Sequence, residues 1–384
     1  MAQAQLLRAT ACLVAWFALQ ALAAPAAPSL LDFSAEERLR IAAHGPWPTP
    51  APHDHSNRAE RRPAAVAWGR ELFADTRLSA HGHVACASCH RPELAFQDGL
   101  SSPRADAAPA RNTPSLLGTA HQRWWGWGGA HDSLWAANLA PLLDASEMGH
   151  SLPSLAAHLR RTPHLAKGYR RAYGQPMPQN DERLVVDVAK ALAAWQATLR
   201  LPRTAFDDFR DALLRNDRRA AARYPLAAQR GLRLFVGAGR CFFCHAGAAF
   251  SNGEFADIGV SFFVPGGVDD GRHGGLLRLQ SSPYTRLGRH NDDAAADTRV
   301  VMTRHVLLQP RHFGEFKVPG LRQLTRSAPY MHNGSLATLH DVVLHYSELN
   351  EERLHADGER ILRRLNLDAG QRAGLEAFLR SLSR

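Results

Sequence analysis

The sequence predicts a mainly α-helical protein built from two similar units, with long ordered loops and little β structure. Three observations support this prediction. The pattern Cys-x-x-Cys-His occurs twice, beginning at Cys86 and at Cys241. Several segments carry apolar residues at helical spacing, and none shows the alternation typical of a half-buried strand. Glycine (29 residues) and proline (23 residues) are numerous for a helical protein, which indicates long connecting segments.

Length and composition fit an ordinary globular protein. The 384 residues allow one large domain or two of usual size. Hydrophobic residues make up 45% and charged residues 21%, which excludes a disordered or membrane-spanning chain. The net charge is +10, but the basic residues are scattered singly or in pairs, so we expect no nucleic-acid interface. The charge instead suits an acidic protein partner or bound anionic groups.

Residues 1–23 resemble a secretory signal peptide, which predicts an exported, periplasmic protein. Arg8 precedes a short apolar run at residues 11–22, and Ala21-Leu22-Ala23 is an Ala-x-Ala cleavage site. The run is short for a bilayer span, so we expect no stable membrane insertion after cleavage; an uncleaved anchor is the alternative. Cleavage would remove Cys12 and leave four cysteines, all within the repeated pattern.

The repeated pattern predicts two covalently bound haem c groups. Cysteines in an exported chain usually form disulfides, but Cys-x-x-Cys followed by His is the attachment signature of c-type haem. The thiols add to the two vinyl groups of the porphyrin, and the histidine binds the iron. A redox-active cysteine pair or a zinc site is the alternative, and neither requires the trailing histidine. The expected haem-binding residues are Cys86, Cys89 and His90, and Cys241, Cys244 and His245.

In the first unit, assigned to residues 24–203, four helices are expected in order. Ser34 and Glu37 form a capping box that opens a short helix, which the proline-rich "GPWPTPAP" ends. A second helix is predicted over residues 63–75, and a third in "SLWAANLAPLLD", after an irregular stretch at 99–131. The clearest helix covers 181–199, where apolar residues share one face: Leu184, Val188, Leu192, Trp195 and Leu199.

The second unit is assigned to residues 204–384, because "LRLPRTAFDDF" is a natural boundary. A helix at about 225–237 should lead into the second Cys-x-x-Cys-His turn. Residues 251–315 are rich in Gly, Asp, Arg and His, and we expect mostly loop there. Ser335 is expected to cap a helix over 336–347, and a last helix is expected over 367–382.

Three further stretches resemble the bacterial di-haem cytochrome c peroxidase and MauG family. They are "ARNTPSLLG", "RWWGWGGAHDSLWAANLAPLLDASEMGH" and "FKVPGLRQLTRSAPYMHNGSLATLHDVVLHYSE", which lie in the family's order. With both haem turns, the resemblance covers roughly residues 60–382. It implies a peroxide-reactive first haem and a second haem that transfers electrons or stores charge.

The resemblance assigns residues around the first haem. His90 matches its proximal ligand and Glu147 the distal acid, although a glutamate in this context is ordinarily a solvated surface residue. A carboxylate beside an accessible iron can move a proton between the two oxygens of peroxide. Pro141 matches a distal-pocket position of the MauG branch. The family's distal glutamine is replaced by Ala137, with Asn138 next to it, so its role is left unassigned.

Two further features are implied between the haems. Trp127 matches the tryptophan that carries oxidising equivalents from one haem to the other, although its neighbours Trp124 and Trp125 leave an ordinary core role open. A calcium site is implied at Asn112, Ser327 and Pro329. Calcium accepts amide and carbonyl oxygens. The family usually has Thr where Ser327 stands, and a carbonyl ligand tolerates that change.

The distal ligand of the second haem distinguishes the branches of the family. Peroxidases that use small cytochromes have a methionine fourteen residues after the histidine of "APYMH", here His332, and that position is Tyr346. Met331 is out of register. Tyr346 shares a helix face with Val343; a buried core tyrosine is the alternative. A phenolate ligand favours oxidised iron, as in MauG. MauG's surface tryptophan, two residues before its second haem motif, is replaced by Gly239.

Two functional hypotheses follow. In the first, the chain is a peroxidase that reduces hydrogen peroxide at the first haem, shares oxidising equivalents with the second, and takes electrons from a protein donor or protein substrate. In the second, it is a di-haem electron-transfer cytochrome without peroxidase activity. There a histidine would close the first haem's distal side, and the candidates are His81, His83, His121 and His131.

Overall fold

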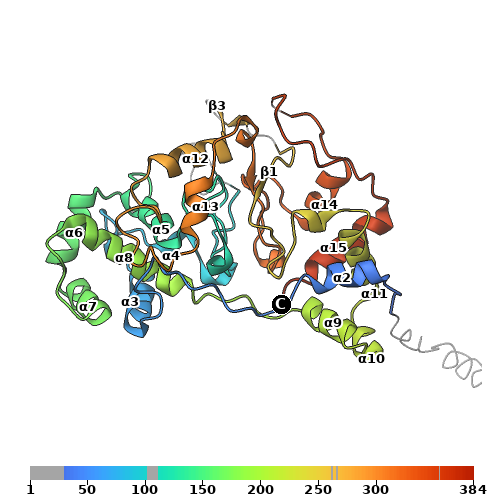
Figure 1. The fold of residues 1–384 in the computed structure, drawn as a ribbon, viewed down its shortest axis with the longest axis horizontal. Helices are drawn as coiled ribbons and strands as arrows, with labels where there is room; N and C mark the ends of the chain where they lie inside the picture. The colour runs from blue at the N-terminus through green and yellow to red at the C-terminus, as the bar shows by residue number, and fades with distance from the viewer. Residues whose placement is uncertain (1–29, 102–110, 261–262, 265–266, 354) are drawn as a thin grey trace, which may run out of the picture.

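The computed structural model describes residues 30–101, 111–260, 263–264, 267–353 and 355–384, and it is mostly helical, as predicted (Figure 1). The predicted signal peptide lies outside the described residues. Within them, no helix is both long and apolar enough to cross a bilayer. Figure 1 shows two helical halves side by side, and buried side chains form a separate large core in each.

The first core is built around the long helix α8. Asn180 caps this helix by accepting from the amide of Arg183, and the helix ends at Gln196, three residues before the predicted end. Its face of Leu184, Val188 and Leu192 is buried, as expected from the spacing. The helices of this half are α3 (Pro63–Ala74), α4 (Cys86–Cys89), α5 (Leu134–Leu143), α6 (Leu152–Arg161), α7 (Pro163–Tyr173) and α8 (Asp181–Gln196), with the 3₁₀ turns η1 (Thr76–Leu78), η2 (Pro92–Leu94) and η3 (Thr119–His121).

The second core lies around α11 and α15, with a cluster of phenylalanine rings that includes Phe206, Phe235, Phe250 and Phe378. Helix α2, near the start of the chain, packs here too, and its Ser34–Glu37 capping box is present as predicted. The helices are α2 (Ala35–Ala42), α9 (Ala205–Leu214), α10 (Arg218–Ala221), α11 (Leu226–Val236), α14 (Leu339–Ser347) and α15 (Ala369–Arg380), with η4 (Cys241–Phe243) and η6 (Leu324–Arg326). The proposed boundary at residues 203 and 204 stays a prediction.

The two halves share one packing device. In each, the helix that precedes the Cys-x-x-Cys-His turn crosses a later helix at a glycine. A Cβ on Gly69 of α3 would lie 2.0 Å from the carbonyl oxygen of Ala191 in α8. A Cβ on Gly231 of α11 would lie 1.9 Å from the carbonyl oxygen of Gly374 in α15. Only glycine allows such close crossings, which place each turn against its core.

Residues 251–315 are mostly loop, as predicted, but this stretch also holds α12 (Arg272–Ser281), α13 (Val300–His305) and η5 (Pro310–His312), which were not predicted. Leu276 and Leu279 pack against Trp124, and this tertiary contact outweighs the glycine-rich composition. Ser335 is not a cap; α14 begins at Leu339, where Thr338 and Asp341 form the capping box.

Strands are few and short within the described residues, in agreement with the predicted fold class. β1 (Phe255–Ala256) pairs antiparallel with β4 (Phe316–Lys317), and β2 (Phe263–Val264) pairs antiparallel with β3 (Gly267–Val268). The β1–β4 pair lies between the halves in Figure 1. It follows that the loops around β4 form part of the space between the two cores.

Candidate haem sites and the space between them

Both Cys-x-x-Cys-His segments fold as one tight turn. The amide of His90 donates to the carbonyl of Cys86 at 2.9 Å, and the amide of His245 donates to the carbonyl of Cys241 at the same distance. Among the described residues, the four cysteines of these turns are free of disulfides and half-buried. Each turn therefore presents two thiols and an imidazole together.

The thiols do not resemble a redox-active pair. Burial raises the pKa of the Cys86 thiol to about 12, with smaller contributions from Glu147 and Cys89. Burial likewise raises the pKa of the Cys241 thiol to about 12. Redox-active cysteines have a lowered pKa, because the thiolate is the reactive form. The two turns thus fit covalent haem attachment better than thiol–disulfide exchange.

Each motif histidine is oriented by a main-chain carbonyl. Nδ1 of His90 donates to the carbonyl of Phe96 at 2.9 Å, and Nδ1 of His245 donates to the carbonyl of Phe250 at 3.0 Å. This tautomer leaves the lone pair on Nε2, the atom that would bind iron. Burial lowers the pKa of both imidazoles, and the carbonyls partly oppose it. The sequence does not reveal this role of Phe96 and Phe250, because each acts through its main-chain oxygen, which every residue type carries.

These residues fit two haem groups. The first haem site is defined here as Cys86, Cys89 and His90, and the second haem site as Cys241, Cys244 and His245. The roles of individual residues at both sites stay predictions, and the following paragraphs give their positions.

Glu147 lies on a loop that turns back toward the first haem site. In this distal loop (residues 144–149), the amides of Glu147 and Gly149 donate to the carbonyl of Asp144, and the amide of Met148 donates to the carbonyl of Pro141. Glu147 is exposed, and its carboxylate is close enough to Cys86 to raise the pKa of that thiol. The loop thus brings a carboxylate, reachable by water, beside the first haem site.

Helix α5 supplies the other predicted distal residues. Pro141 and Ala137 are both half-buried. Asn138 is buried, and it exchanges two side-chain hydrogen bonds with Gln196 of α8, at 3.0 and 2.8 Å. The side-chain amide of Asn138 is therefore engaged in hydrogen bonds within the first core.

Tyr346 lies on α14 and points toward the second haem site. Burial raises the pKa of its phenol above the ordinary value, and the thiols of Cys241 and Cys244 raise it further. A phenol influenced by both thiols lies on the side of the helix that faces the attachment turn. Val343, one turn earlier, is buried in the second core, so the helix face predicted from the spacing does point inward.

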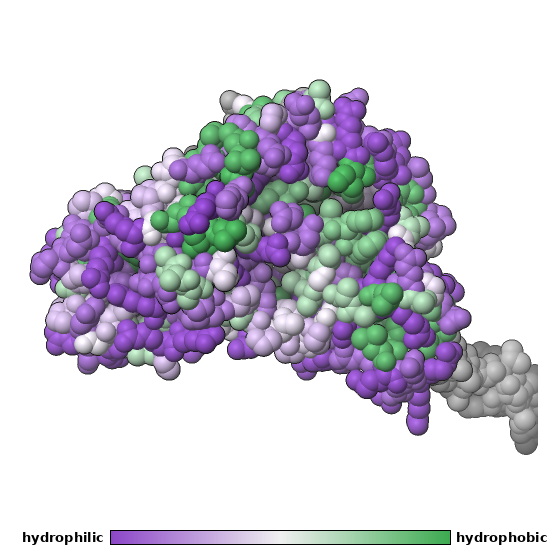
Figure 2. Space-filling model, viewed as in Figure 1, coloured by the Kyte–Doolittle hydropathy of each residue, from purple (hydrophilic) through white to green (hydrophobic). Residues whose placement is uncertain are grey.

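A cavity of about 370 Å³ lies between the halves, and the surface in Figure 2 is recessed there. Trp127, Asn112, Ser327 and Pro329 all line it. Nε1 of Trp127 donates to the carbonyl of Asn112 at 2.7 Å, and the carbonyl of Trp127 accepts from the amide of Lys317 in β4 at 2.8 Å. The structure therefore places Trp127 between the two cores.

The predicted calcium residues also meet at this cavity. Nδ2 of Asn112 donates to the carbonyl of Pro329 at 2.7 Å, whereas Oδ1 of Asn112 is buried without a hydrogen-bond partner among the described residues. Ser327 lies two residues before Pro329, at the end of η6. A buried, unpaired amide oxygen next to carbonyl oxygens suits a hard cation.

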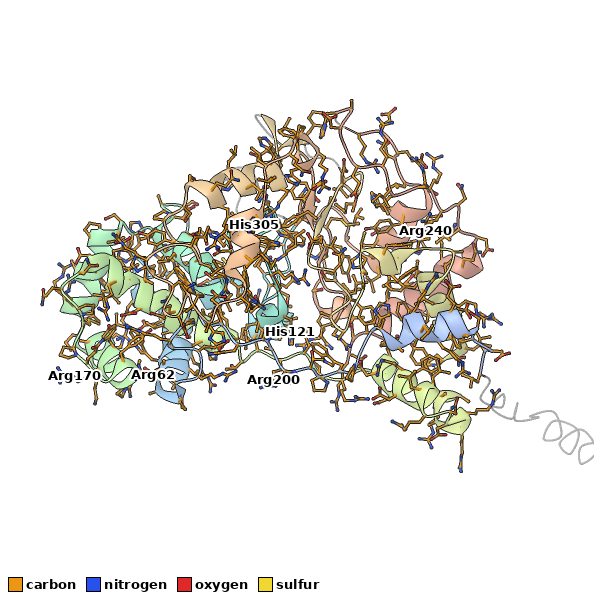
Figure 3. All side chains as sticks on the ribbon, viewed as in Figure 1. Arg62, His121, Arg170, Arg200, Arg240 and His305 are labelled. Carbon is orange, nitrogen blue, oxygen red and sulfur yellow. The ribbon has the colours of Figure 1, made fainter. Side chains whose placement is uncertain are left out.

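The four histidines considered as distal ligands lie in different places. His81 and His83 are exposed. Nε2 of His81 lies 3.5 Å from the position a Cβ on Gly149 would take, so His81 borders the distal loop. His121 lines the central cavity and lies between the halves in Figure 3. Burial lowers the pKa of His131, which lies three residues before α5, to about 4.

Comparison with known proteins identifies the family. A family model described as di-haem cytochrome c peroxidase matches residues 63–214. The methylamine utilization protein MauG of Methylorubrum extorquens is 32% identical over 359 residues, which cover 93% of this chain and 88% of that protein. The chain belongs to the di-haem cytochrome c peroxidase and MauG family. As a member of this family it is a haem-dependent oxidoreductase, and membership implies two haem c groups.

Other relatives agree with this assignment. Cytochrome-c peroxidase IdrP1 of Pseudomonas sp. strain SCT is 28% identical over 351 residues, or 88% of this chain and 84% of that protein. A MauG-like protein associated with microbial copper homeostasis has a similar fold, with a TM-score of 0.64, 24% identity, and coverage of 88% of this chain and 95% of that one. The di-haem peroxidase BthA of Burkholderia thailandensis also has a TM-score of 0.64, at 23% identity.

Proposed function

We propose that this family member is a periplasmic peroxidase that reduces hydrogen peroxide at the first haem site and takes its electrons from a protein. A contrast between the two sites supports the proposal: Glu147 lies close to Cys86, whereas Tyr346 lies close to Cys241 and Cys244. A haem held at the first haem site would supply an iron able to react with peroxide, and a haem held at the second haem site would supply a store for an oxidising equivalent.

Glu147 moves the proton that peroxide cleavage requires. Breaking the O–O bond is easiest when the departing oxygen leaves as water, so a proton must pass to it from the other oxygen. A carboxylate beside the first haem site can accept that proton and return it, and its exposure on the distal loop lets it exchange protons with solvent. Pro141 and Ala137 carry no side-chain hydrogen-bonding group, so the proton transfer is assigned to Glu147 alone.

Tyr346 and Trp127 handle the oxidising equivalents. A phenolate oxygen is a hard anionic ligand that favours the more oxidised states of iron, so Tyr346 would make the second haem a store of oxidising equivalents. To bind a metal as phenolate, Tyr346 would have to lose its proton, and burial, which raises its pKa, makes that loss harder. Trp127, on the wall of the central cavity, would relay oxidation between the sites.

A bound calcium ion would link the two sides of the central cavity. The unpaired Oδ1 of Asn112 is one ligand, and the carbonyls of Ser327 and Pro329 are two more. These residues come from both sides of the cavity, since Asn112 precedes α5 and the other two follow η6. A bound cation would therefore fix the distance between the two haem sites.

The electron donor is a protein met in the periplasm. The net charge of +10 favours an acidic partner. Either a small redox protein or a protein substrate with an oxidisable side chain is consistent with this charge. Gly239 removes the surface tryptophan that the MauG resemblance would place there, so the exit point must differ from that of MauG.

A second candidate function is electron transfer without peroxide reduction. His81 favours it, because this exposed imidazole borders the distal loop and could reach an iron at the first haem site.

Peroxide consumption by the purified protein tests the proposal. The protein is first shown to contain two haem c groups by the pyridine haemochrome assay, and is then mixed with peroxide and a reduced acidic cytochrome. We expect peroxide loss coupled to oxidation of two cytochromes per peroxide. A fully loaded protein that binds two haems but leaves peroxide unchanged contradicts the proposal and favours the electron-transfer candidate.

A further inference from the structure

Three aromatic rings connect the proximal side of the first haem site to helix α8. The carbonyl that holds Nδ1 of His90 belongs to Phe96, whose ring centroid lies 6.1 Å from that of Trp195. Phe73 of α3 completes the contact, 6.2 Å from Phe96 and 4.3 Å from Trp195. The residue that orients the proximal ligand is therefore in an aromatic cluster with a tryptophan.

Trp195 reaches the surface at the other end of this cluster. The face of α8 is fully buried at Leu184, Val188 and Leu192, but Trp195 near the helix end is only half-buried. It lines a surface groove of about 630 Å³ together with Pro63, Val66, Ala67, Arg70 and Glu71. A second cavity of about 490 Å³ continues the groove, since both are lined by Glu60, Arg61 and Thr198. Arg200, in that continuation, lies along the same edge as Arg62 in Figure 3.

The other tryptophans of the described part of the chain lack this combination. Trp127 is half-buried but lines the cavity between the halves. The remaining five are at most 5% exposed: Trp47, Trp68, Trp124, Trp125 and Trp135. Trp195 thus combines contact with the proximal side of the first haem site and access to the outer surface.

We propose that Trp195 is the point at which oxidising equivalents leave the first haem site, and that an electron-rich phenol or phenolic side chain in the groove is the reductant. The indole is among the most easily oxidised side chains, and one electron can pass from it along the ring cluster. This inference rests on the proposed peroxidase function and deepens it, because Gly239 removes the exit that resemblance to MauG implies.

Two one-electron oxidations of Trp195 supply the two electrons that one hydrogen peroxide requires. Reduction of one hydrogen peroxide to two waters takes two electrons and two protons. Trp195 gives up one electron at a time and regains it from one phenol, which loses its hydroxyl proton as it becomes a phenoxyl radical. Two phenols are thus oxidised per peroxide, and their two protons are those consumed in forming water.

The test uses the di-haem protein and Trp195→Phe, in which a ring of similar shape preserves packing but resists oxidation. Each is mixed with one equivalent of peroxide without donor, frozen for electron paramagnetic resonance, and digested for peptide mass spectrometry. We expect a tryptophan radical and oxygen addition at residue 195 in the native protein, and loss of both in Trp195→Phe. With 2,6-dimethoxyphenol as the probe, the native protein should lose the oxidation at Trp195, and Trp195→Phe should oxidise the probe more slowly.

Trp68→Phe is the matched control, since Trp68 is buried in the same core without lining the groove. It should keep the radical and the oxidation at Trp195. If the haem absorption changes with peroxide equally in all three proteins but Trp195 is never oxidised, the exit proposal is wrong and the peroxidase proposal survives. If the haem absorption does not change in any of them, both proposals are wrong.

Discussion

Nδ1 of His90 donates a 2.9 Å hydrogen bond to the main-chain carbonyl of Phe96. His245 and Phe250 repeat this relationship in the second half, at 3.0 Å. Both phenylalanines have positive φ, 62° and 57°, in the left-handed region that costs energy for residues other than glycine. The same strained backbone conformation therefore occurs at both sites, and in each it directs a carbonyl oxygen toward the imidazole of the motif histidine. We interpret this as the device that fixes both proximal ligands.

Replacing Glu147 by Gln should lower the rate of peroxide reduction by about 10²–10³-fold, because an amide cannot relay the proton. Stopped-flow mixing with peroxide, followed at the haem absorption, measures this rate. Glu93→Gln is the control, since Glu93 is exposed and only three residues from His90; it should react as the native protein does. A Glu147→Gln protein that reduces peroxide at the native rate would show that Glu147 is not the distal acid.

Glu315 should make stability depend on pH. Burial raises its pKa from 4.5 to about 7, and Arg311 partly opposes this. Between those values the folded state holds a proton that the unfolded state has released, so the free energy of unfolding falls as pH rises through this window. The loss is at most about 3 kcal/mol.

Glu315→Gln should remove this dependence, since the amide does not titrate. Urea unfolding measures the stability of both proteins at pH 4.5 and at pH 8. At pH 4.5 the native protein and Glu315→Gln should be similarly stable, and at pH 8 Glu315→Gln should be the more stable of the two. The exposed Glu352→Gln should follow the native protein at both. A native pH profile in Glu315→Gln would show that this carboxyl is already ionised in the folded state.

Calcium should copurify at about one ion per chain, and removing it with EGTA should lower the thermal midpoint by about 2–4 °C for each kcal/mol of binding free energy lost. Re-added calcium should restore the midpoint and magnesium should not, because magnesium demands a tighter octahedral site. Asn112→Ala should lose the ion and the effect of EGTA. Metal analysis that finds no calcium in the native protein would exclude the site.

The first haem site should rest with an accessible distal position, so the ferric protein should show a high-spin signal in electron paramagnetic resonance. His81→Ala should leave that signal unchanged. A low-spin native spectrum that becomes high-spin in His81→Ala would mean that His81 closes the site, and would favour the electron-transfer function.

Local sequence was enough for much of the fold, because the decisive interactions are short-range. The capping box at Ser34, the face of α8 and the turn at each haem motif all depend on residues within a few positions. Helix α12 was missed because its stability comes from packing against Trp124, which is far away in sequence.

The site shows the same division. Tyr346 was singled out by the family resemblance, and helical spacing could then assign it to the inward face that it shares with Val343. The sequence could not show which way the side chain of Asn138 points, because its hydrogen-bond partner, Gln196, lies 58 residues later. The exposure of Trp195 was also hidden, since helical spacing gives the face of a helix but not where that face emerges from the core.

The absorption spectrum of Tyr346→Phe tests the central claim most directly. Tyr330→Phe is the matched control, because its phenol is hydrogen-bonded to the carbonyl of Leu324 and would bind no iron. We expect both variants to keep two haems per chain, and only Tyr346→Phe to lose the phenolate-to-iron charge-transfer absorption. A Tyr346→Phe protein that keeps two haems and the native spectrum would contradict tyrosine ligation at the second haem site.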